Sequence, residues 1–141
     1  IKKGKKMNQE KNFIQTENAP KAIGSYSQAV RVGNTVWISG QIPLDPKSMI
    51  LVGDNSEDGF NKQTHQVFKN LKNIAEAAGG SLENIVKLNI FLTDLKFFPN
   101  VNEIMQQYFD EPYPARAAVG VKSLPKDSAI EAEAILIINN N

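Results

Sequence analysis

The pattern of apolar and polar residues predicts an α+β fold with six strands and two helices. From Phe60 to Ala78 apolar residues recur at spacings of three and four, which is typical of an amphipathic helix, and Gly79–Gly80 is a good stop for it. A second helix is expected to begin at Pro99 and to carry an apolar stripe as far as Phe109. Strands are expected at residues 12–15, 29–32, 35–40, 85–95, 115–121 and 129–138, with loops at 41–59 and 122–128. This order favours a single domain over residues 12–141, in which both helices pack on one face of a mixed sheet.

A sheet of this kind has apolar side chains on both of its faces. The helices cover one face, whereas the segments VWISG, LNIFL and AEAILII leave apolar residues on the other. A closed homo-oligomer that buries this second face is the simplest solution, and we expect one. The alternative is a monomer whose own loops cover the face.

The residue types that are absent narrow the possible chemistry. The 141 residues include no cysteine, which excludes a disulfide framework, a thiolate nucleophile and any cysteine-based metal site. His65 is the only histidine, and we interpret it as a surface or boundary residue of the first helix. No metal-binding motif and no glycine-rich phosphate loop occurs, so neither a metal nor a cofactor is expected. No apolar run approaches the ~18 residues that span a bilayer, which favours a soluble protein with no membrane partner.

Positive charge is concentrated at the start of the chain. Residues 1–11 contain five lysines and one glutamate, whereas the remaining chain has 11 basic and 14 acidic residues and a net charge of −3. We interpret residues 1–11 as a flexible basic extension, or as a remnant that precedes a natural start at Met7. The alternative is a tail that contacts RNA or an anionic membrane. Because the rest of the chain is mildly acidic, nucleic acid is not an expected partner.

Three full charges stand out in the last two predicted strands, which otherwise resemble core. Arg116 lies among small residues in ARAAVGV, and Glu131 and Glu133 lie in AIEAEAILII. An arginine with small neighbours could hold the carboxylate of a small ligand through two parallel hydrogen bonds. A nearby glutamate could then accept a proton from water. A structural ion pair between Arg116 and either glutamate explains the same residues, and the pattern alone does not decide between the two interpretations.

The chain resembles the RidA (YjgF-type) family of reactive-intermediate deaminases. The matching segments are APKAIGSYSQAV, ISGQIPLDP, NLKNIAEAAGGSLENIVKLNIFLTDL, VNEIMQQYF and YPARAAVGVKSLPKDSAIEAEAI. The resemblance implies a chorismate-mutase-like fold, a homotrimer and sites in clefts between subunits. It also implies a cofactor-independent 2-iminobutanoate/2-iminopropanoate deaminase, which hydrolyses 2-aminoacrylate-type enamines and imines released by pyridoxal-phosphate enzymes to 2-oxo acids and ammonia. A cytoplasmic location is expected, with a mitochondrion or another organelle as the alternative.

The resemblance also assigns roles to individual residues. The carboxylate-binding arginine of the family falls on Arg116, and its water-activating glutamate falls on Glu131, whereas Glu133 is interpreted as structural. The other substrate-binding positions that it implies are Tyr26 of the IGxY motif, Ser39 and Gly40 of the SGQ motif, and Asn102.

The sequence departs from the family pattern at two positions, and other functions stay open. Ala118 stands where many members have cysteine, and Ser25 replaces a common proline. One alternative function, also known within the family, is an RNA-binding or endoribonuclease-type inhibitor of translation. Another is a chaperone-like or ligand-sensing trimer that binds small 2-oxo acids without turning them over.

Overall fold

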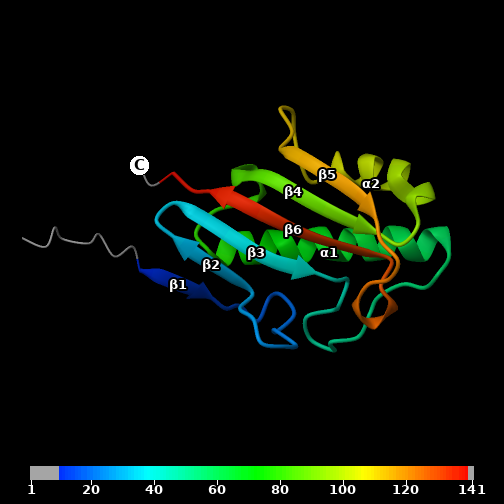
Figure 1. Cartoon of the computed structure of the whole chain (residues 1–141), viewed down its shortest axis with the longest axis horizontal. Coiled ribbons are helices and arrows are strands. Elements are labelled where there is room, and N and C mark those ends of the chain that lie inside the picture. The colour runs from blue at the N-terminus through cyan, green and yellow to red at the C-terminus, as the bar shows by residue number, and fades with distance from the viewer. Residues whose placement is uncertain (1–9, 140–141) are drawn as a thin grey trace, which may run out of the picture.

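The α+β architecture expected from the sequence is confirmed. The computed structural model describes residues 10–139, which form one six-stranded sheet with two α-helices behind it (Figure 1). Most of the predicted basic extension, residues 1–9, lies outside the described residues, and so do residues 140–141 of the predicted domain. The strands are β1 (Lys11–Ile14), β2 (Ala29–Val32), β3 (Thr35–Gln41), β4 (Ile85–Leu92), β5 (Ala115–Gly120) and β6 (Ile130–Ile137), and the helices are α1 (Glu57–Ala77) and α2 (Phe98–Met105). Within residues 10–139 no helix is long and apolar enough to cross a membrane.

The sheet is mixed, and its strand order is β1-β2-β3-β6-β4-β5. All neighbouring strands are antiparallel except β4 and β5, which run parallel because α2 lies in the connection between them. The last strand of the chain, β6, therefore lies between β3 and β4 near the middle of the sheet, and β5 forms an edge. Both helices lie on the same side of the sheet, as Figure 1 shows.

The core lies between this covered face and the two helices. Alternate residues of β6 are buried against the helices, and the residues between them are only partly covered, as strand geometry requires. The helix residues that fill the core repeat at the predicted spacings of three and four. The largest fully buried side chains are Phe60, Phe68, Leu44, Leu71, Ile74, Leu88, Ile90, Leu92, Ile130 and Leu136.

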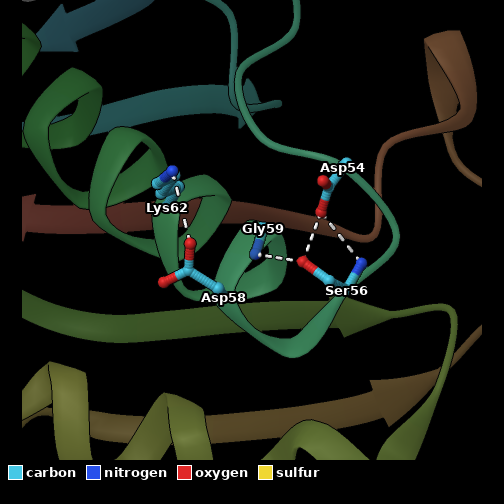
Figure 2. A network of polar contacts seen from close by, with 5 residues as sticks. All are labelled: Asp54, Ser56, Asp58, Gly59 and Lys62. Carbon is cyan, nitrogen blue, oxygen red and sulfur yellow. Dashed lines mark hydrogen bonds and ion pairs between the residues drawn. The ribbon is translucent and has the colours of Figure 1, made fainter.

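The first helix begins three residues earlier than its apolar pattern indicates. Ser56 is the N-cap, and its Oγ accepts a hydrogen bond from the backbone N–H of Gly59 at 2.9 Å. Asp54 in turn accepts hydrogen bonds from the hydroxyl and the backbone N–H of Ser56, and Asp58 pairs with Lys62 one turn along the helix (Figure 2). The first two residues of the helix, Glu57 and Asp58, are thus polar and exposed, and for this reason apolar periodicity did not reveal the start of the helix.

The second helix is shorter than its apolar stripe predicts. It ends at Met105; Tyr108 follows in a turn, and Phe109 lies in the irregular segment after that turn. Both rings still pack on Phe68 of α1, with centroid distances of 5.3 Å and 5.9 Å. Burial of these aromatic side chains explains the continuing pattern, since apolar residues at helical spacing can reach the core from turns as well.

The second face of the sheet is open within one chain, as the sequence predicted. Val30, Trp37 and Ile135 are register partners in a row across it, and Trp37 is 46% exposed. Phe13 and Val119 are exposed at opposite ends of the sheet. The alternative of a monomer that covers this face with its own loops is therefore wrong for the part of the chain that the structure describes.

We predict that Ser56→Ala lowers the free energy of unfolding by about 1 kcal/mol, because the backbone N–H of Gly59 loses its acceptor. Urea unfolding followed by circular dichroism measures this change. Ser123→Ala, at an exposed serine outside the helices, is the matched control and should change the value by less than about 0.5 kcal/mol. An equal loss in both variants would contradict the capping role.

Candidate active site

Arg116 lies on the edge strand β5 and points towards α2. Its Nη1 donates a hydrogen bond to Oδ1 of Asn102 at 2.6 Å and contacts the sulfur of Met105 at 3.6 Å. The guanidinium carbon also lies 5.0 Å from the centre of the Phe98 ring. All three partners belong to α2, so this helix determines where the guanidinium lies.

A cavity of about 450 Å³ opens beside this arginine. It is lined by Asn102, Met105, Gln106, Tyr113, Pro114 and Arg116. The sequence suggested that the small residues of β5 leave room around the arginine, but the cavity lies elsewhere. Gly120 instead faces Leu95, whose Cγ would lie 3.2 Å from a Cβ at that position, and Ala118 packs against the core. The cavity lies instead beside Tyr113 and Pro114, which directly precede β5.

Glu131 lies on β6 at the open face of the sheet. Its side chain fits against Gly40 of β3, where a Cβ atom would lie only 2.8 Å from Oε2 of Glu131. Burial raises the pKa of the Glu131 carboxyl, and the neighbouring charge of Glu133 raises the same pKa further. The carboxyl of Glu131 therefore keeps its proton to a higher pH than an exposed glutamate does, which suits a group that has to exchange protons.

Ser39 lies near the C-terminal end of β3, and Tyr26 lies in the segment just before β2. The Tyr26 hydroxyl accepts a hydrogen bond from the backbone N–H of Ile23 at 3.2 Å, and its ring is 45% exposed. The Ser39 hydroxyl donates to the carbonyl oxygen of Ser27 at 2.5 Å, which fastens β3 to the segment that follows Tyr26. Tyr26 and Ser39 are thus carried by two segments that are held together.

Gln28 is the structural residue of this region that the sequence did not reveal. It is 3% exposed, and its Nε2 lies within hydrogen-bond distance of the carbonyl oxygens of Thr16, Ala19 and Pro20. Its Oε1 accepts from the backbone N–H of Thr16 at 2.7 Å. One amide therefore fastens the first part of the loop between β1 and Tyr26. In the sequence, Gln28 is only a polar residue directly before a strand. Its structural role can be inferred once its side chain is known to be buried, because buried polar groups need hydrogen-bond partners.

Arg116 and Glu131 lie on opposite faces of the sheet. Arg116 is the register partner of Leu88, and Glu131 is the register partner of Phe91. Leu88 is fully buried against the helices, whereas Phe91, three residues further along the same strand, points to the open face. The alternative of an ion pair between Arg116 and a glutamate of the same chain is therefore wrong, since Glu133 shares the face of Glu131.

His65 lies outside both groups of candidate residues. Its Nδ1 is 2.8 Å from the hydroxyl of Tyr108, and its ring is partly buried between α1 and the turn after α2. Burial lowers the pKa of His65, and the charge of Lys69 lowers it further. The boundary position expected for this histidine is confirmed. Among residues 10–139, no three histidine, aspartate or glutamate side chains are grouped as a metal site requires.

The comparison with known proteins identifies the family. The family model described as endoribonuclease L-PSP matches residues 16–138. The chain belongs to the endoribonuclease L-PSP family. Human 2-iminobutanoate/2-iminopropanoate deaminase is 47% identical to this chain over 127 residues, which are 90% of each protein. A RutC family protein of Pyrococcus horikoshii is 50% identical over 125 residues, 89% of this chain and 96% of that protein.

Solved structures of this family have the same fold. The crystal structure of RidA from an Antarctic Psychrobacter bacterium matches with a TM-score of 0.85 and 54% identity, over 90% of this chain and 99% of that one. The resemblance to the RidA family inferred from the sequence is therefore confirmed, and the fold of the endoribonuclease L-PSP family is the fold described above. The roles of individual residues stay predictions.

We predict that Glu133→Gln lowers the pKa of Glu131, because the substitution removes a negative charge that disfavours ionisation of the neighbouring carboxyl. Carboxyl-carbon NMR of protein labelled at glutamate measures the titration of Glu131 directly. Glu103→Gln, at an exposed position of α2, is the matched control and should leave the pKa of Glu131 unchanged. A pKa of Glu131 that does not fall in Glu133→Gln would show that the two carboxyls do not interact.

Proposed function

We propose that this protein hydrolyses small 2-imino acids and their enamine tautomers to 2-oxo acids and ammonia, at sites shared between two subunits of a homotrimer. The observation that carries the proposal is that the two candidate catalytic residues of one chain lie too far apart to act together. An oriented arginine beside a cavity and a glutamate with a raised pKa lie on opposite faces of one chain. The similarity to the human 2-iminobutanoate/2-iminopropanoate deaminase supports the substrate class.

Assembly supplies what one chain lacks. Because Arg116 and Glu131 cannot meet within a chain, a second copy has to bring its own Arg116 to the open face that carries Glu131. Trp37 and Val119 make this face apolar, and its burial against other copies provides the driving force. A closed ring of three such contacts buries the open face of every subunit and forms three equivalent sites.

The first step in this mechanism is binding of the substrate. The guanidinium of Arg116 holds the carboxylate of the imino acid through two parallel hydrogen bonds. The imino carbon then lies against the Tyr26 and Ser39–Gly40 region of the neighbouring subunit. The absence of a side chain at Gly40 leaves the carboxyl of Glu131 in place beside it. Fixing these groups in one orientation is a large part of the catalysis that the reaction needs.

The chemical step requires one proton acceptor that later becomes a donor. The oxygen of a water molecule attacks C2 of the protonated imine while Glu131 accepts a proton from that water, which gives a neutral tetrahedral carbinolamine. Glu131 then returns this proton to the amino group. The C–N bond breaks, ammonia leaves, and the hydroxyl proton passes to Glu131 as the carbonyl of the 2-oxo acid forms. A glutamate with a raised pKa is suited to both transfers near neutral pH.

The deaminase activity is tested by adding the protein to a threonine dehydratase reaction and following the appearance of 2-oxobutyrate. We expect acceleration by the native protein and a loss of about 10- to 100-fold in Arg116→Ala, because the substrate carboxylate loses a charged partner. Lys72→Ala removes a positive charge from the exposed side of α1 and is the control. No acceleration by the native trimer would leave only a binding function for this protein.

The shared site is tested by mixing two impaired variants. Arg116→Ala and Glu131→Gln are each expected to be strongly impaired alone, but their mixed trimers contain one interface at which both native residues meet. After unfolding and joint refolding in equal amounts, about a quarter of the native activity should return, since three quarters of the trimers are mixed and each has one intact site of three. A mixture that gains no activity, although mass spectrometry shows mixed trimers, would place both residues in one subunit's site.

A further inference from the structure

The hydrogen bonds of Arg116 determine which edge of its guanidinium can bind a ligand. A guanidinium has five N–H groups, two on each terminal nitrogen and one on Nε. The Oδ1 atom of Asn102 lies 2.6 Å from Nη1, and the sulfur of Met105 lies 3.6 Å from the same nitrogen. Two acceptors thus face Nη1, which has two N–H groups. The other three N–H groups belong to Nε and Nη2.

Phe98 restrains the same group by a different interaction. Its ring centre lies 5.0 Å from the guanidinium carbon, a distance at which a cation is attracted to an aromatic ring. Met105 is 4% exposed, and its contact with Nη1 is partly buried. Rotation of the guanidinium would therefore break a short hydrogen bond and a cation–ring contact at once.

We propose that Phe98, Asn102 and Met105 are positioning residues, which fix Arg116 so that a carboxylate binds only through the Nε and Nη2 edge. An arginine can hold a carboxylate bidentately through Nε and Nη2 or through its two terminal nitrogens, and the second mode needs an N–H of Nη1. With Nη1 engaged by α2, only the first mode remains. The identity of the ligand, a small 2-imino or 2-oxo acid, rests on the proposed function.

This inference changes the role of Asn102. The resemblance to the family placed Asn102 among the substrate-binding residues, whereas its Oδ1 faces Arg116 in the structure. Asn102 then affects the ligand through the arginine rather than by touching the ligand. Met105 receives a role that neither the sequence pattern nor the resemblance assigned. An apolar residue on the apolar stripe of a helix is predicted to be part of the core.

The first experiment measures the restraint without any ligand. Nitrogen NMR of the arginine side chains reports rotation of the guanidinium, because slow rotation separates the two Nη signals. We expect separate Nη signals for Arg116 in the native protein and merged signals in Asn102→Ala. Asn100→Ala is the matched control, because Asn100 lies on the same helix but donates hydrogen bonds to Glu57 and Asn61. Merging in both variants, or in neither, would overturn the positioning role.

The second experiment measures binding of 2-oxobutyrate by calorimetry, which requires no turnover. Asn102→Ala should raise the Kd about tenfold, and Met105→Leu, which keeps the apolar volume, should raise it about two- to threefold. In the deaminase assay the same variants should raise KM by these factors and change kcat less than about twofold. Asn100→Ala should change neither value.

A double-mutant comparison separates positioning from direct contact. Lysine at position 116 keeps the positive charge but has no planar guanidinium to orient. Asn102→Ala should therefore not raise the Kd for 2-oxobutyrate any further in an Arg116→Lys protein. A further tenfold loss in that protein would mean that Asn102 touches the ligand itself, and the proposal would then fail. A native protein that binds 2-oxobutyrate but accelerates no imine hydrolysis would instead refute the proposed function and leave this inference intact.

Discussion

Alternation of side chains across the sheet is the constraint on which the candidate site depends. One face of the sheet packs against α1 and α2, so every second residue of the central strands has to be apolar and buried. Arg116 falls in register with a buried residue of β4, and Glu131 falls in register with a residue of the open face. The strand geometry that builds the core therefore also keeps the two candidate catalytic groups apart within a chain.

Each half of the candidate site is supported by a different kind of structure. Arg116 depends on α2, a short helix whose residues supply a hydrogen bond, a sulfur contact and an aromatic ring. Glu131 depends on the sheet itself, because it fits beside Gly40 where β3 and β6 change register between Ile38 and Gln41. The loop that carries Tyr26 depends on the buried amide of Gln28. Rigid elements thus hold every candidate group except the exposed ring of Tyr26.

Periodicity predicted best those elements that bury one face in the core, such as α1, β4 and β6. It could not locate the start of α1, where the stabilising groups are polar, or the end of α2, where Phe109 reaches the core from beyond the helix. The sequence also identified Arg116 and Glu131 as unusual charges, but it did not show that they lie on opposite faces of the sheet. That fact depends on the register between β4, β5 and β6, which pairs residues far apart in the chain and leaves no local signal.

The sulfur contact at Arg116 has a consequence for oxidative damage. The sequence contains three methionines and no cysteine, and Ala118 occupies the position after Arg116 on the same strand face. Peroxides and disulfides therefore find no thiol to modify beside the guanidinium. The oxidisable atom there is the thioether of Met105, which is 4% exposed and whose sulfoxide would be a far stronger acceptor for Nη1. Burial of Met105 thus limits its oxidation beside the guanidinium of Arg116.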